Sequence, residues 1–204
     1  MRVCCGLAVR PNRRVCRSTD GIRWDKCPPT ESVAKHFLAY RKDTYAVTTF
    51  GEGSDRLVRL RDGKWDTVCA TPDGTGFQYI REFRNSLFLG GSNTATETAA
   101  IYCFAGSSLK KVFEADEKGG FFSGFARVRQ AGREWLYAAC CAGWRARDKR
   151  GAVYRTADGT HWELAQAFDE AECWTVATGE GTGVLYAATR QEGGNGKIYR
   201  VELK

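Results

Sequence analysis

The sequence predicts an all-β fold, a β-propeller of about five four-stranded blades. Three observations support this expectation. A short strand pattern recurs five times, its copies start 42, 44, 52 and 45 residues apart, and turn signals separate the strand-like runs without any long helical period. A period of 40 to 50 residues is the length of one propeller blade. The five copies are Val15–Arg17, Leu57–Arg59, Ile101–Cys103, Val153–Arg155 and Ile198–Arg200.

Each copy reads as the third strand of its blade, because a second strand of small and β-branched residues precedes it by 12 to 17 residues. Innermost strands are expected upstream of the last four second strands, and outermost strands downstream of the first four copies. The predicted blades are residues 1–27, 31–69, 75–115, 119–168 and 172–204 of a single domain.

The end blades are predicted to be incomplete, since the first lacks an innermost strand and the last an outermost one. Three arrangements remain open. The chain closes as a five-bladed ring with two three-stranded blades, it is a piece of a larger ring, or it is an open arc that completes itself by association.

The turn between the third and fourth strands carries the sharpest motif, [Ser/Thr]-x-Asp-Gly-x-x-Trp, in which Asp accepts hydrogen bonds from turn amides and Gly takes the positive φ. The Trp is expected to cover the hairpin and anchor the outer strand. Two full copies and a shortened one occur. They comprise Ser18, Asp20, Gly21 and Trp24; Thr156, Asp158, Gly159 and Trp162; and Asp62, Gly63 and Trp65.

These segments resemble the Asp boxes of BNR-repeat propellers, a family that includes sialidases and sortilin-type receptors. The resemblance implies a propeller whose Asp boxes lie at the rim, away from the ligand-binding face. It therefore implies that Asp20 and Asp158 are turn residues and not catalytic carboxylates.

Composition narrows the class of protein. The longest nearly apolar run, residues 136–144, is too short to span a bilayer, and we expect no signal peptide. Nine cysteines without a CxxC argue against a disulfide framework or a zinc site and favour reduced cysteines in a cytoplasmic protein, with a redox role for the pairs Cys4–Cys5 and Cys140–Cys141 as the alternative. The net charge of +7 permits anionic partners, but interleaved acidic loops make nucleic acid an unlikely one.

The loops that join second to third strands are expected to share one face with the inter-blade loops, and propeller ligands bind there. The longest is residues 143–151, in which an aromatic side chain stands beside several cations. Such a set suits a sugar, an oxyanion or a protein partner, although a solvated insertion is the alternative. The candidate binding residues are Trp144, Arg145, Arg147, Lys149 and Arg150.

The innermost strands supply the residues nearest to a sialidase-like set of arginines, tyrosine and glutamate, although none matches that family's motifs. The candidates are Tyr79, Arg81, Glu82 and Arg127, and the same strands also offer Lys35, His36, Ser123, Trp174 and Thr175. With only His36 and His161, a metal site or a Ser-His-Asp triad has little support, and we expect no cofactor.

Two function hypotheses remain. The first is a non-enzymatic binding or scaffold propeller that holds a protein or carbohydrate near Trp144, with self-association through the incomplete end blades as a possibility. The second is a glycoside hydrolase of the BNR-repeat kind, or a degenerate relative. Paired carboxylates about 5 to 10 Å apart in a deep pocket would favour the enzyme.

Overall fold

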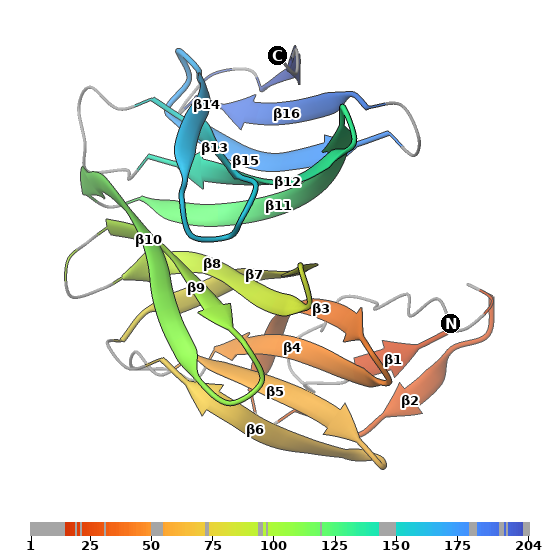
Figure 1. The fold of residues 1–204 in the computed structure, drawn as a ribbon. Coiled ribbons are helices and arrows are strands. Elements are labelled where there is room, and N and C mark those ends of the chain that lie inside the picture. Colours follow the sequence, from red (N-terminus) through yellow and green to blue (C-terminus); the bar gives the residue numbers. More distant parts are fainter. Residues whose placement is uncertain are drawn as a thin grey trace.

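The computed structural model describes residues 15–18, 20, 22–30, 32–49, 55–71, 74–93, 96, 98–118, 120–142, 150–179, 183–191, 194 and 196–201, with the side chains of residues 17 and 116–118 excepted. Within these ranges every regular element is an antiparallel strand. The sheets follow one another along an arc (Figure 1).

The strands form consecutive meanders. The first sheet is a hairpin of β1 (Val15–Arg17) and β2 (Asp25–Cys27). The next holds β3 (Val33–Tyr40), β4 (Asp43–Thr49), β5 (Arg56–Arg61) and β6 (Lys64–Ala70). The third holds β7 (Gly76–Phe83), β8 (Ser86–Asn93), β9 (Thr98–Phe104) and β10 (Leu109–Lys118).

The remaining seven described strands are β11 (Phe121–Gln130), β12 (Arg133–Cys141), β13 (Ala152–Thr156), β14 (Glu163–Ala167), β15 (Glu172–Thr178), β16 (Leu185–Arg190) and β17 (Lys197–Val201). They count as one sheet because Cys141 pairs with Glu172 where β12 meets β15. We call β15–β17 the terminal sheet.

Tight hairpins connect successive strands because their turn residues adopt positive φ, which matches the right-handed twist of the strands they join. The turn pairs are Asp62–Gly63 (φ 50° and 78°), Arg84–Asn85 (49° and 61°) and Ala131–Gly132 (47° and 77°).

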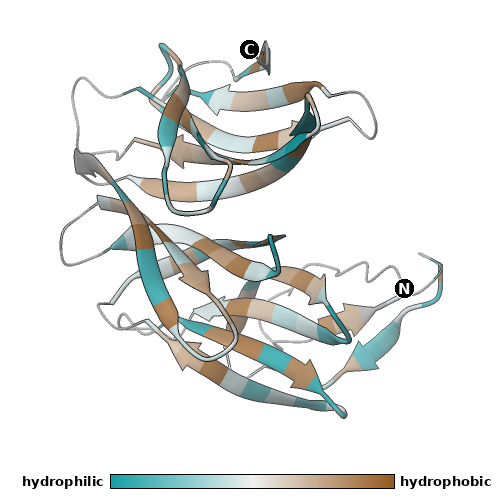
Figure 2. Cartoon of the chain, in the orientation of Figure 1, coloured by the Kyte–Doolittle hydropathy of each residue, from teal (hydrophilic) through white to brown (hydrophobic). Residues whose placement is uncertain are grey.

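The apolar core lies in layers between successive sheets, as the alternating brown and pale bands along the strands suggest (Figure 2). Val47 and Leu57 of one sheet pack with Ile80 and Leu89 of the next. The following layer contains Phe88, Ile101, Phe122 and Leu136. The last contains Val128 and Val153 with Val176 and Leu185 of the terminal sheet.

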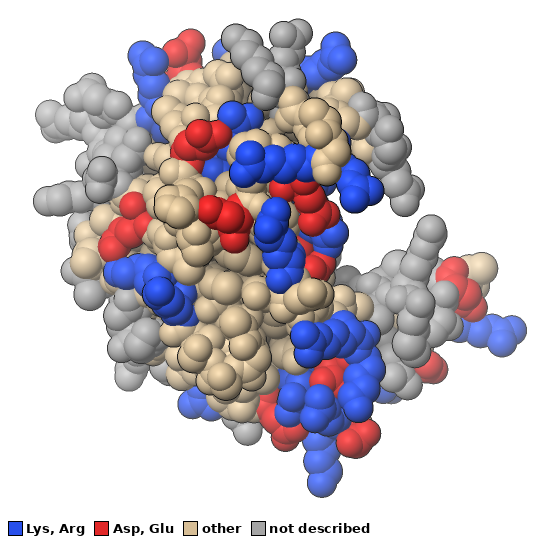
Figure 3. All heavy atoms as spheres, in the orientation of Figure 1, with Lys and Arg blue, Asp and Glu red and all other residues tan. Residues whose placement is uncertain are grey.

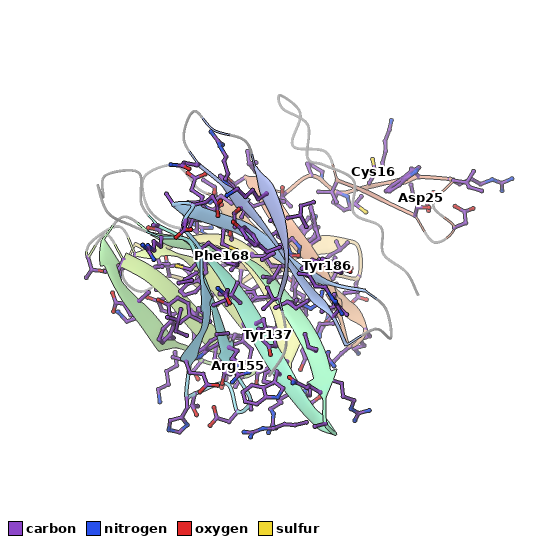
Figure 4. All side chains as sticks on the ribbon, turned by 90° about the horizontal axis from the view of Figure 1, so that it is seen from above. Cys16, Asp25, Tyr137, Arg155, Phe168 and Tyr186 are labelled. Atoms are coloured by element: carbon purple, nitrogen blue, oxygen red, sulfur yellow. The ribbon has the colours of Figure 1, made fainter. Side chains whose placement is uncertain are left out.

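Each end of the arc is incomplete within the described residues. The first sheet has two strands, and its hairpin, marked by Cys16 and Asp25, projects away from the packed sheets (Figure 4). The terminal sheet has three strands, and one of its faces leaves Tyr186 42% and Ile198 78% exposed. Residues 1–14, which include the Cys4–Cys5 pair and the expected second strand of blade one, lie outside the described residues.

The seven described cysteines are all reduced thiols. Burial raises the pKa of Cys141 to about 12, which disfavours a reactive thiolate at this residue. In the part of the chain that the structure describes, no helix is long and apolar enough to cross a membrane.

Candidate functional site

Two of the expected catalytic residues meet, but as an ion pair. The guanidinium of Arg127, on β11, binds the carboxylate of Glu82, on β7, and so links two sheets. The same guanidinium donates to Glu134 Oε1 from Nη2 at 2.6 Å and from Nε at 3.0 Å. Both carboxylates are therefore engaged by one arginine, and the arrangement reads as a bridge between sheets.

Tyr79 and Arg81 lie on the same strand but have other neighbours. The Tyr79 ring packs on His36, with 3.6 Å between ring centroids, and burial raises the pKa of its phenol. Burial and the charge of Arg81 lower the pKa of His36 to about 4. The raised pKa of Tyr79 is opposite to the lowered pKa of an activated nucleophile.

Three of the expected inter-blade loops carry the further carboxylates Asp73, Asp116 and Asp169. Asp169 is 88% exposed in its side chain and lies 3.7 Å from Arg150 Nη1. Asp73 and the side chain of Asp116 lie outside what the structure describes. In that same part of the chain, no group of three or more His, Cys, Asp or Glu side chains could hold a metal ion.

The two full Asp-Gly turns use aspartate as a backbone acceptor. Asp158 Oδ1 accepts from the amides of Thr160 at 2.7 Å and His161 at 2.8 Å. Asp20 Oδ1 accepts from the amides of Ile22 and Arg23, each at 2.8 Å. These bonds hold the pKa of both carboxyl groups below the ordinary range. Ser18 and Thr156 add side-chain bonds to the aspartates, and Gly21 lies outside the described residues.

The tryptophans of the three turns behave differently. Trp162 stacks on Phe113 of β10, in the neighbouring sheet, with 5.7 Å between ring centroids. The Trp65 Nε1 group donates to Pro28 O at 2.9 Å in the shortened turn of Asp62 and Gly63. Trp24 is 44% exposed and covers less, because its hairpin projects from the packed sheets.

Of the five candidate binding residues, only Arg150 is described, and Trp144, Arg145, Arg147 and Lys149 lie outside the described residues. Backbone hydrogen bonds hold the two described ends of their loop. Ala142 N donates to Ala171 O at 2.9 Å, and Gly151 N donates to Glu170 O at 2.6 Å. A Cβ at Gly151 would lie 2.5 Å from Cys173 N, so this close approach requires glycine.

An exposed tryptophan stands next to this stem. Trp174, on β15, is 42% exposed, and its Nε1 donates to Glu172 Oε2 at 2.6 Å. The ring of Phe121 meets it edge-on, with 5.6 Å between centroids, and Arg190 Nε lies 3.7 Å from the same Glu172 oxygen. These contacts hold the indole in place while a large part of it faces solvent. The sequence placed Trp174 on an innermost strand but gave no sign that it would be exposed beside Ala142 and Gly151, the described ends of the loop.

Glu170 fixes the adjoining inter-blade loop to the terminal sheet. Its carboxylate binds Lys197 Nζ at 2.5 Å and the Tyr199 hydroxyl at 2.9 Å. The Lys197 bond, followed by the Tyr199 bond, lowers the pKa of Glu170 to about 2. The loop beside Trp174 is thus anchored by a charge-assisted network.

No protein-family model and no curated protein matches the sequence. Among solved structures, a chain of a nidogen/laminin complex superposes with a TM-score of 0.62 at 12% identity, over 92% of this chain and 74% of that one. This chain is a β-propeller. A β-fructofuranosidase from Bombyx mori, solved as a mutant in complex with sucrose, is similar at a TM-score of 0.46 and 13% identity, over 86% of this chain and 47% of the enzyme chain.

Proposed function

We propose that this propeller is a non-enzymatic binding module whose partner docks on the loop face beside the Trp144 loop. The observation that carries the proposal is the exposed indole of Trp174, held by Glu172 and Phe121 at the stem of that loop. Trp144, Arg145, Arg147, Lys149 and Arg150 would complete the surface around it.

A protein partner is favoured over a carbohydrate. The terminal sheet also exposes Tyr186 and Ile198, so apolar surface extends beyond what one sugar ring would cover. Tryptophan, tyrosine and arginine are the residues that most often dominate protein interfaces. A protein complex is also what the nidogen/laminin structure is named for.

The ion pairs at the inner strands favour binding over hydrolysis. One guanidinium, that of Arg127, binds both Glu82 and Glu134, and burial raises the pKa of Tyr79, whose ring packs on His36. A retaining glycosidase needs one carboxyl group that is free to attack and a second that is free to donate its proton.

We also propose that the turns at Asp20 and Asp158 are Asp boxes with a structural role. Their aspartates accept two turn amides each, which is the chemistry that this motif requires. Seven reduced cysteines among the described residues support a reducing compartment such as the cytoplasm. The end sheets, which have two and three strands among the described residues, support self-association as a second use of the exposed terminal sheet.

Site-specific photo-crosslinking tests the docking surface. We expect a photoreactive residue at Trp174 to form a cross-link of defined mass to a protein partner, and the same residue at Trp24 to form none. Trp24 is a matched control because it is an exposed tryptophan (44% against 42%) on a distant hairpin. A Trp174→Ala substitution should then weaken binding of the partner so identified by about tenfold or more, as for an interface hot spot.

Equal cross-linking from positions 174 and 24 would show that the loop face has no special role. A cross-link between two copies of the chain would assign the surface to self-association. A cross-link only to glycans would show that the partner is a carbohydrate and not a protein.

A further inference from the structure

A second candidate site lies at the strand ends opposite to those that carry Ala142 and Gly151. A cavity of about 650 Å³ opens between the β3–β6 and β7–β10 sheets. The β3–β4 turn, the ends of β5 and the β7–β8 and β9–β10 turns form its walls. In an antiparallel meander these ends point away from the strand ends that the second-to-third-strand loops join, so the cavity is remote from Ala142 and Gly151.

The cavity carries a strong excess of positive charge. Its charged lining consists of Arg41, Lys42, Arg59 and Arg61 against the single carboxylate of Asp43. Four cations and one anion leave a net charge of three positive charges on this lining. Figure 3 shows Lys and Arg gathered over the turn ends of the β3–β6 sheet, in the lower right part of the molecule.

Asp43 does not neutralise this cluster. Arg61 engages it with two bonds, Nη2 to Oδ2 at 2.5 Å and Nε to Oδ1 at 3.2 Å. The Nε of Arg59 is 4.0 Å from Asp43 Oδ2 and is buried without a hydrogen bond. The Arg59 side chain as a whole is 27% exposed, and Asp43 is too far away to hydrogen-bond it, so the charge of this guanidinium can attract an oxyanion in the cavity.

Aromatic and apolar side chains form the rest of the wall. The Tyr40 and Tyr45 rings meet edge-on at 5.9 Å between centroids, and the Tyr40 hydroxyl donates to Asn85 O at 2.5 Å. The guanidinium of Arg41 lies 5.1 Å from the Tyr40 ring centroid. Val68 and Phe104 add apolar surface. The volume falls within the usual range for small-molecule sites, about 300 to 1,000 Å³.

We propose that this cavity binds a phosphate monoester of a small organic molecule. A phosphate monoester carries close to two negative charges. It therefore suits a lining with a net excess of positive charge better than a ligand with a single carboxylate does. Arg59 and Arg61 bind the phosphate oxygens, Lys42 adds a point charge at the mouth, and the organic part packs on Tyr40 and Tyr45.

Isothermal titration calorimetry of the full chain tests the site with four probes: AMP, glucose 6-phosphate, inorganic phosphate and glucuronate. We expect saturable binding of AMP or glucose 6-phosphate, with weaker binding of inorganic phosphate and glucuronate. Preference between AMP and glucose 6-phosphate tells a planar base from a sugar as the organic part. Removing one guanidinium in Arg59→Gln should weaken binding by about tenfold, because a charge-assisted hydrogen bond is lost.

Two further variants keep the test decisive. Lys42→Gln, at an exposed turn residue, should weaken binding by about threefold and carries the test if Arg59→Gln fails to fold. Arg129→Gln removes the same charge from an exposed position on β11 outside the cavity lining and should leave affinity unchanged. The proposal is overturned if no phosphate monoester binds saturably, if glucuronate binds as tightly, or if all three variants behave alike.

Discussion

Replacing Phe122 with alanine is expected to lower the free energy of unfolding by about 4 kcal/mol. The Phe122 side chain is fully buried between the β7–β10 sheet and β11, where its ring contacts Phe113 and Tyr154 at 5.9 Å between centroids. Its Cβ lies 2.8 Å from where a Cβ on Gly90 would stand, so the two sheets approach too closely to rearrange around the lost ring. Urea denaturation followed by tryptophan fluorescence measures the change.

Leu164→Ala is the control for this substitution. Leu164, on β14, is 58% exposed, so its truncation should change the free energy of unfolding by no more than about 0.5 kcal/mol. If Phe122→Ala cost only about 1 kcal/mol, the packing of these two sheets against each other would be wrong.

Gly91→Ala is expected to destabilise the protein by about 3 kcal/mol through overpacking. A Cβ at position 91 would lie 2.0 Å from Gly76 O, 2.8 Å from Gly76 C and 3.0 Å from Phe77 Cα. All three atoms belong to the backbone of the paired strand β7, so no side chain can move aside and the strand pair itself must shift. Thermal and urea unfolding of the variant give the loss of stability.

A second glycine separates the steric cost from the conformational one. Gly132, in the β11–β12 turn, has φ +77°, and a Cβ added there would meet no atom within 4 Å, so Gly132→Ala should cost only about 1 kcal/mol. Equal losses in the two variants would contradict the close pairing of β7 and β8 at Gly91.

The repeat made the fold predictable because each blade repeats the same local chemistry. Strand runs such as 136–141 and 185–190 are rich in small apolar residues, and Asp-Gly pairs mark turns between third and fourth strands. Local signals of this kind survive in a single sequence. The close contact of Cys141 with Glu172, which joins β11–β14 to the terminal sheet, depends on the packing of neighbouring sheets and left no local signal.

The candidate sites were less predictable because their residues meet only in three dimensions. The sequence suggested Glu82 and Arg127 as candidate catalytic residues. The ion pairs that Arg127 makes with Glu82 and Glu134 depend on how two sheets pack. Arg59 ends one of the five repeated strand copies, and the repeat gives no sign of what its side chain contacts. Arg59 faces Asp43 of its own sheet and lines a cavity built from five separate segments.

The claim that this propeller binds a partner and does not hydrolyse glycosides is tested most directly by a turnover assay. The purified chain is incubated with aryl glycosides of neutral and acidic sugars, including a sialoside and a fructoside, beside a Glu82→Gln variant. We expect no release of aglycone above the buffer rate from either protein, since Arg127 holds Glu82 in an ion pair. Release by the unsubstituted chain that disappears in Glu82→Gln would contradict the account and make the inner strands an active site.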